Sequence, residues 1–172
     1  IRPGWFYHAD EQPMSPEELV NIYLTSVGRG GTLLLNLAPD RRGRIPDKDI
    51  ASLMAWREIV DATFNRDLAA DAHFEASSSR GEGFEAEAMR GKDNAYWATA
   101  DGVTTGDVTL KWDVLITAKY VVIEEHIALG QRIREFSIEA REGDKWIEVA
   151  KGTTVGYKRI LALDGTVSTN EL

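Results

Sequence analysis

The feature that most constrains the fold is a run of apolar residues between two helical patterns, Thr32-Leu33-Leu34-Leu35-Asn36-Leu37. The run does not alternate between apolar and polar residues, as a strand with one exposed face would. A continuous apolar strand is typical of a parallel sheet that is covered on both faces. The order of helix, strand and helix therefore predicts part of an α/β barrel or of a doubly wound sheet.

The helices on either side of this run have different start signals. Before it, Ser15-Pro16-Glu17-Glu18 predicts a helix that begins with a capping box, and Gly28 is expected to end that helix. After it, Asp47 or Asp49 is expected to cap the next helix. The inward side of that second helix is predicted to carry Ile50, Leu53, Met54, Trp56, Ile59 and Val60. One strand and two helices cannot enclose a core, so residues 1–66 are predicted to be the end of a larger domain.

The pattern changes after Arg66. Residues 68–74 are predicted to be a linker rich in Ala and Asp, and short alternating stretches separated by turn residues follow it. Strands of this kind predict an antiparallel sandwich over residues 67–172. No closing strand is evident near Thr169, so the sandwich is expected to be incomplete and the chain truncated at both ends. The strand candidates are Val108–Val114, Lys119–Glu125, Ile133–Arg141, Trp146–Lys151 and Tyr157–Ala162.

Composition argues against several classes of function. A net charge of −8 disfavours nucleic acid and anionic membranes as partners, and no apolar run approaches the length of a membrane span. The chain has no Cys, and its three histidines, His8, His73 and His126, lack the spacing of metal ligands. Asp93 and Asp101 lie in a loop that could hold a structural calcium, although no calcium-loop motif is present. We therefore expect no metal site and no cofactor.

The first eight residues, Ile1-Arg2-Pro3-Gly4-Trp5-Phe6-Tyr7-His8, combine Arg and His with three aromatic residues and show no helical or strand pattern. We call them the aromatic segment. Aromatic rings can cover the apolar face of a sugar while Arg and His pair with its hydroxyls. A buried aromatic loop held by one Arg would give the same pattern, and composition alone favours that simpler interpretation. Asn36, at the carboxyl end of the predicted strand, is either a site residue or an amide that caps its loop.

These stretches resemble a family 29 α-L-fucosidase, and most closely the branch that acts on α-1,3- and α-1,4-linked fucose. Residues 1–8, 15–20, 26–31 and 33–36 are similar to the end of its catalytic barrel. Residues 76–81, 96–99, 124–127, 130–133 and 152–159 are similar to its C-terminal discoidin-like, galactose-binding-like domain. The resemblance thus implies a partial (β/α)8-like barrel end over residues 1–66, followed by an all-β jelly-roll sandwich over residues 67–172.

The resemblance also implies a function, that of a secreted or periplasmic retaining glycosidase acting on a fucosylated oligosaccharide or glycoconjugate. Such an enzyme uses one carboxylate as nucleophile and a second as acid/base, and the resemblance places both upstream of Ile1. This chain alone is therefore expected to be inactive. Together with the remainder of the barrel, it would supply one wall of the sugar pocket.

The implied substrate-binding residues lie in the aromatic segment and at Asn36. The resemblance places Trp5 against the sugar near its C6 methyl group. Arg2 is expected to brace the loop or the neighbouring acid/base glutamate, and bracing is favoured over direct contact because an adjacent cation would lower the pKa of that glutamate and oppose its acid role. Tyr7 and His8 are further candidates. Three carboxylates, those of Asp10, Glu11 and Asp40, are expected near this face of the domain, and we attribute them to solvated loops rather than to catalysis.

Two other functions stay open for residues 67–172. The sandwich could itself bind sugar, which would make the chain a non-catalytic carbohydrate-binding protein, or it could serve only to stabilise the barrel. Trp97, Trp112 and Trp146 are expected to pack in the core rather than to form a sugar platform. A set of polar residues is interpreted as a buried network or a domain contact: Glu124, Glu125, Gln131 and Arg132.

Overall fold

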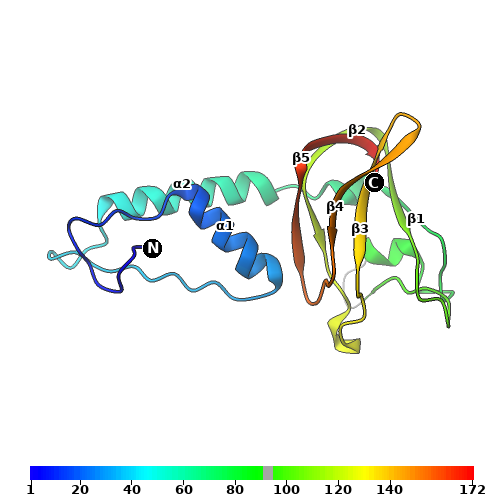
Figure 1. The fold of residues 1–172 in the computed structure, drawn as a ribbon, viewed down its shortest axis with the longest axis horizontal. Helices are drawn as coiled ribbons and strands as arrows, with labels where there is room; N and C mark the ends of the chain where they lie inside the picture. The colour runs from blue at the N-terminus through cyan, green and yellow to red at the C-terminus, as the bar shows by residue number, and fades with distance from the viewer. Residues whose placement is uncertain (91–94) are drawn as a thin grey trace. The chain divides into compact units, whose positions relative to one another are not determined.

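The computed structural model describes residues 1–90 and 95–172, and it divides into two compact units, Ile1–Arg66 and Asp67–Leu172. The first unit consists of helices joined by extended segments, and the second consists mainly of strands (Figure 1). Within the described ranges, no helix is both long enough and apolar enough to span a membrane.

The first helix of unit 1, α1, runs over Pro16–Ser26 and begins with the predicted capping box. The Ser15 side chain accepts a hydrogen bond from the backbone N–H of Glu18, whose carboxylate in turn accepts from the backbone N–H of Ser15. The expected end at Gly28 is wrong. A short 3-10 helix, η1, continues over Val27–Arg29, and Gly30 is the residue with left-handed backbone, at φ +79°. Gly30 takes this role because a left-handed residue without a Cβ terminates a helix without strain.

The second helix, α2, spans Asp47–Phe64, and the prediction that Asp47 or Asp49 caps it is wrong. Its N-cap is Pro46, which makes no side-chain hydrogen bond, while both aspartates lie inside the first turn. There they are favoured by the positive end of the helix dipole. The predicted inward side is also only partly buried in this chain, because Ile50, Met54 and Ile59 are 45%, 55% and 37% exposed.

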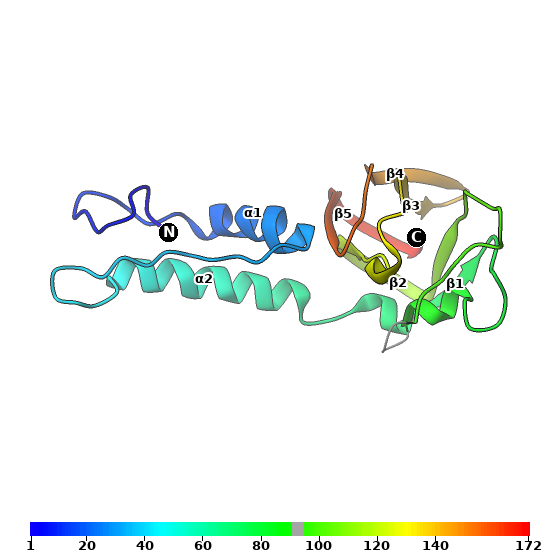
Figure 2. The same cartoon turned by 90° about the horizontal axis from the view of Figure 1, so that it is seen from below.

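The predicted strand over residues 32–37 does not form. The segment is extended and runs back beside the two helices (Figure 2), but neither sheet of the described structure includes it. A strand requires ladder hydrogen bonds to a neighbouring strand, and the sheets lie entirely in unit 2. Unit 1 is instead held by helix packing, in which the Tyr23 ring of α1 lies 6.3 Å from Trp56 and 5.8 Å from Phe64 of α2.

Unit 2 contains two antiparallel sheets. One has the strand order β1-β2-β5, from strands His73–Ala76, Val108–Ile123 and Arg159–Glu171, and the other is a hairpin of β3 (Phe136–Glu142) and β4 (Lys145–Gly152). Short 3-10 helices lie at Leu68–Asp71, Ala86–Arg90 and Ile127–Leu129. The core consists of Ala118, Ala140, Val149 and Leu163, one from each of β2, β3, β4 and β5. The two sheets therefore pack against each other through their apolar faces.

The strand predictions for unit 2 need three corrections. The candidates 108–114 and 119–125 are one long strand, β2, which stays continuous because irregularities in its pairing with β5 absorb the break in alternation. The predicted linker 68–74 contains the start of β1, which pairs with β2 from His73 to Ala76. A closing strand does exist, since β5 continues to Glu171 and pairs with Lys111. Nothing in its local sequence marks that distant partner.

Candidate functional site

The aromatic segment forms a loop that is held at its start and at Trp5 by hydrogen bonds with residues outside the segment. The backbone nitrogen of Ile1 donates to the carbonyl of Asn36, and the side-chain amide of Asn36 donates to the carbonyl of Trp5 at 2.8 Å. The backbone N–H of Met14 closes the loop by donating to the carbonyl of Ile1 at 2.8 Å. Asn36 therefore contacts the segment directly, as an amide that fixes its backbone.

Arg2 provides the strongest attachment of this loop. Its Nε and Nη2 atoms donate to both carboxylate oxygens of Asp49 over 2.6–3.1 Å, and the two side chains are only 5% and 0% exposed. Nη1 donates to the carbonyls of His8 and Glu11. Hydrogen bonding to Asp49 raises the pKa of the guanidinium above its ordinary value, against the effect of burial. Arg2 is thus a brace that ties the segment to the first turn of α2.

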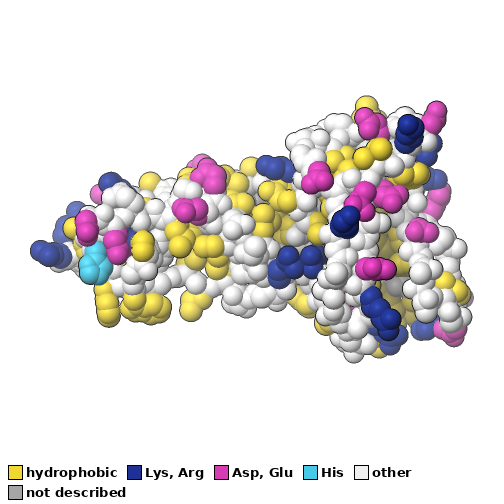
Figure 3. All heavy atoms as spheres, viewed as in Figure 1, with side chains coloured by type: hydrophobic (Ala, Val, Ile, Leu, Met, Phe, Trp, Pro, Cys, Tyr) yellow, Lys and Arg dark blue, Asp and Glu magenta, His cyan; other side chains and the backbone are white. Residues whose placement is uncertain are grey.

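The other three predicted site residues lie in the same loop but face different surroundings. The guanidinium of Arg2 lies over the Tyr7 ring, 5.0 Å from its centroid, so Tyr7 is part of the brace. His8 is exposed, and its carbonyl accepts from Arg2. Trp5 and its neighbour Phe6 are 70% and 74% exposed. They belong to the hydrophobic side chains that remain at the surface of the chain, some of which are seen in Figure 3.

The pairing of Asp49 with this segment is not predicted from the sequence. An acidic residue at the start of a helix predicts a helix cap instead. One feature of the sequence does indicate a partner: an Arg that braces a loop needs a carboxylate to bind, and Asp49 lies next to the apolar residues of α2. The separation of 47 residues between Arg2 and Asp49 prevents the pairing from being predicted from local sequence.

The three carboxylates assigned to solvated loops behave differently from one another. Asp10 is exposed, as expected. Asp40 is not simply solvated, because Arg42 donates to it from both side chain and backbone, and these hydrogen bonds lower the pKa of Asp40. Glu11 also differs: its Oε2 is buried and has no hydrogen-bond partner within the described residues. Gly4 packs so closely that a Cβ there would lie 3.2 Å from Glu11 Oε1.

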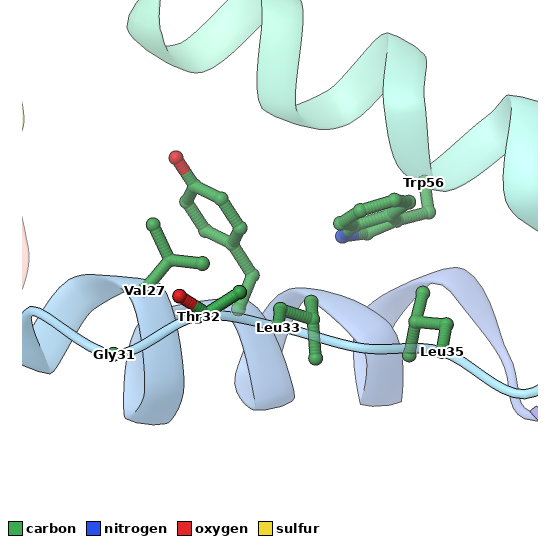
Figure 4. A pocket seen from close by; sticks show the side chains of 7 residues that line it. Val27, Gly31, Thr32, Leu33, Leu35 and Trp56 are labelled. Atoms are coloured by element: carbon green, nitrogen blue, oxygen red, sulfur yellow. The ribbon is translucent and has the colours of Figure 1, made fainter.

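A second feature of unit 1 is an open apolar hollow of about 500 Å³ (Figure 4). Trp56 of α2 lies on one side of it, and the extended segment with Leu33 and Leu35 lies on the other. The lining contains no carboxylate, imidazole or amine, and its polar side-chain groups are the Tyr23 phenol, the Thr32 hydroxyl and the Trp56 indole N–H. Its residues are Tyr23, Val27, Gly31, Thr32, Leu33, Leu35 and Trp56.

In unit 2 the predicted set of Glu124, Glu125, Gln131 and Arg132 is not a buried network, because Glu124, Gln131 and Arg132 are exposed and Glu125 alone of the four is partly buried. The carboxylate of Glu125 accepts hydrogen bonds from the backbone N–H groups of Arg132 at 2.6 Å, Ile133 at 2.9 Å and Gly156 at 2.6 Å. Burial raises the pKa of this carboxyl, but the three hydrogen bonds outweigh it, so the net pKa lies below the ordinary value. Glu124 instead pairs with Lys158 at the surface. The three hydrogen bonds accepted by Glu125 join two loops and are structural in character.

The three tryptophans of unit 2 only partly match the expectation of core packing. Trp112 is 7% exposed and donates from Nε1 to the carbonyl of Leu68. Trp97 is half-buried and donates to the carbonyl of Ser78. Trp146 differs, because it is 40% exposed on β4. Trp146 is left at the surface because the hairpin position at which it lies faces away from the core cluster.

The suggested calcium loop receives no support from the part that the structure describes. Asp93 lies outside the described residues. Asp101 forms an ion pair with Arg80 at 2.7 Å. Across residues 1–90 and 95–172, no group of three or more His, Cys, Asp or Glu side chains is placed to hold a metal ion.

Comparison with known proteins places this geometry in a class. Residues 1–61 match the family model for α-L-fucosidase. The whole chain is 36% identical to Alpha-L-fucosidase 1 of Arabidopsis thaliana, of which it covers 35%. Among solved structures, it superposes on 37% of SpGH29 with TM-score 0.91 and 35% identity. It also superposes on 35% of a Ruminococcus gnavus GH29 fucosidase in complex with fucose, with TM-score 0.88 and 31% identity, and 99% of this chain is covered in both cases.

These similarities extend along both units and therefore define a glycoside hydrolase class rather than a shared fold alone. The chain belongs to the α-L-fucosidase family, glycoside hydrolase family 29. It spans about a third of the length of the curated relatives it matches.

Proposed function

We propose that the protein containing this chain is a retaining α-L-fucosidase that removes α-1,3/1,4-linked fucose from glycans, and that the aromatic segment forms one wall of its sugar pocket. The observation that carries the proposal is the exposed Trp5 on a backbone fixed by Asn36 and Arg2. This arrangement occurs in a chain whose relatives are fucosidases, one of them solved with fucose.

An exposed indole suits a deoxy sugar for a physical reason. Fucose carries a methyl group at C6 where most hexoses carry a hydroxymethyl group, so one edge of the ring is apolar. Packing that edge on Trp5 removes apolar surface from water, and discrimination by one such group is worth about 1–2 kcal/mol. Because the Trp5 carbonyl is held by Asn36, little backbone freedom would be lost on binding.

The two carboxylates of the retaining reaction are proposed to lie in the protein outside this chain. They must stand about 5 Å apart on either side of the glycosidic bond. Near the aromatic segment, Asp49 is committed to Arg2 and Asp40 to Arg42, so neither is free to attack or to transfer a proton. The remaining protein would thus supply the chemistry and this chain part of the binding surface. On the same resemblance, we propose a secreted or periplasmic location.

The test is fucose release from an α-1,3/1,4-fucosylated trisaccharide. We expect release by the full-length protein and none by the 172-residue chain alone. In the full-length protein, Trp5→Ala should lower kcat/KM about 5- to 30-fold, the factor that corresponds to about 1–2 kcal/mol.

Trp146→Ala is the matched control, because Trp146 is also an exposed tryptophan but lies on β4 of the other unit. Its kcat/KM should equal that of the unmodified protein. Turnover by the isolated chain would show that the carboxylates have been placed wrongly. A full-length protein that binds fucosides without cleaving them would favour a carbohydrate-binding protein instead.

A further inference from the structure

The ion pair between Arg2 and Asp49 is unusual in its burial. Asp49 is completely buried and Arg2 nearly so, whereas the pairs Arg57–Asp61, Arg80–Asp101 and Lys111–Glu75 each have at least one side chain that is more than half exposed. Burying two charges costs several kcal/mol per ion before pairing, so a buried pair is weak evidence of stabilisation. It is better evidence of a fixed geometry, because the cost is offset only when every hydrogen bond is well placed.

The contacts of Arg2 show what is fixed. Its guanidinium binds Asp49 with two nitrogens, donates to the carbonyls of His8 and Glu11 with the third, and covers the ring of Tyr7. The guanidinium of Arg2 therefore binds several parts of the aromatic loop at once and connects that loop to α2. A lysine could not make these contacts, since its ammonium is a single point donor rather than a fork.

The exposed aromatic side chains lie between this attachment and the one at Asn36. Trp5 and Phe6 follow Arg2 in sequence and precede His8, and the Trp5 carbonyl is bound by Asn36. Two anchors consequently fix their backbone. The Asn36 anchor consists of two hydrogen bonds, one accepted from the nitrogen of Ile1 and one donated to the carbonyl of Trp5. Arg2 makes more contacts, to both carboxylate oxygens of Asp49 and to the carbonyls of His8 and Glu11, so the larger part of the constraint comes from Arg2 and Asp49.

We infer that Asp49, acting through Arg2, is a positioning residue for sugar binding: it orients the aromatic segment without touching the substrate. This inference rests on the proposed fucosidase function. It assigns a role to a residue of α2 that lies outside the aromatic segment. Displacement of a substrate-positioning group by about 1 Å can cost about 100-fold in rate. Loss of the pair should therefore be visible in kinetics and not only in stability.

The experiment uses the full-length protein with Asp49→Asn and Arg2→Lys. Asn keeps the shape of Asp but turns an NH2 group toward the Arg2 donors, and Lys keeps the charge but loses the fork. We expect kcat/KM on a fucoside to fall about 10- to 100-fold, mainly through KM. The pH profile should keep its shape, because Asp49 transfers no proton. Hydrogen exchange should accelerate at residues 1–11 and not in α1.

The matched controls are Asp61→Asn and Arg57→Lys, which alter another Arg–Asp ion pair whose two residues both lie on α2. That pair has a contact of 2.6 Å, but its side chains are 54% and 67% exposed. These variants should keep both kcat/KM and the exchange pattern. The double variant Arg2→Lys with Asp49→Asn should be no worse than the more severe single variant, because both remove one interaction.

Three results would overturn the inference. In the first, the Asp49 and Arg2 variants melt at lower temperature but retain kcat/KM within about twofold of the controls, the pattern of a purely structural pair. In the second, both variants unfold at the assay temperature, which makes the pair a requirement for folding instead. In the third, exchange at residues 1–11 is unchanged. A failure of the proposed function is distinguishable, since the unmodified protein would then release no fucose while the exchange comparison could still be read.

Discussion

Replacing Glu125 with Gln offers the sharpest test of the forces that hold unit 2 together. All three partners of the carboxylate are backbone N–H donors, two on Oε1 and one on Oε2. Gln has the same shape but offers only one acceptor oxygen. In either orientation of its amide, an NH2 group must face at least one of these donors, so at least one hydrogen bond is lost.

The size of the effect follows from that count. A hydrogen bond to a charged group contributes about 1.5–3 kcal/mol. Since Glu125 is only half-buried, we take the lower part of that range and expect Glu125→Gln to lower the free energy of unfolding by about 2 kcal/mol. Urea unfolding of the 172-residue chain measures it, and hydrogen exchange at Arg132, Ile133 and Gly156 should report the same loss locally.

The same substitution has a predicted pH dependence. Because the pKa of Glu125 is lower in the folded chain than in the unfolded chain, its contribution is complete above the unfolded value of about 4.3. It is lost as the pH falls through the folded pKa. The difference between the original chain and the Gln variant should therefore be largest near neutral pH and should shrink below about pH 4.

Glu124→Gln is the control for this experiment. Glu124 is the adjacent carboxylate, but it is 55% exposed and pairs with Lys158 at 3.0 Å. Its substitution should cost less than about 1 kcal/mol. If Glu125→Gln is no more destabilising than Glu124→Gln, or if the amides of the two loops keep their full protection, the three hydrogen bonds on Glu125 do not stabilise unit 2 as proposed.

Two further substitutions test packing and helix capping. Gly152→Ala should destabilise unit 2 by about 1–3 kcal/mol in urea unfolding, because the added Cβ would lie 2.7 Å from Cζ of Phe136, and a smaller aliphatic residue at position 136 should restore part of the loss. Ser15→Ala should lower the stability of unit 1 by about 1 kcal/mol through loss of the capping box; an unchanged helical circular dichroism melt would contradict this.

Local signals in the sequence predicted the features that depend on near neighbours. The capping box at Ser15 needs only the next three residues, and it forms as predicted. The hairpin of β3 and β4 is also local, because its turn at Gly143 and its alternation are both encoded within a short stretch. The clustering of Arg and aromatic residues likewise pointed to a braced loop, although not to its partner.

Features that depend on distant partners were missed for one shared reason. The end of β5 pairs with Lys111, some sixty positions away, and Asp49 pairs with Arg2 across 47 residues. In each case the local sequence is compatible with several structural roles. A carboxylate at a helix start predicts a cap, and a polar chain end predicts no strand. The tertiary partner determines which role the residue takes.

The extended segment 32–37 shows the same principle from the opposite side. Its apolar, non-alternating sequence does produce an extended chain, with Leu34 89% exposed and Leu33 and Leu35 lining the apolar hollow. The segment lacks the regular backbone hydrogen bonds of a strand, because those bonds require a neighbouring strand. The sequence of residues 32–37 therefore predicts an extended, apolar segment correctly. Whether such a segment is a strand depends on a neighbouring strand with which it can form hydrogen bonds, and the local sequence does not contain that information.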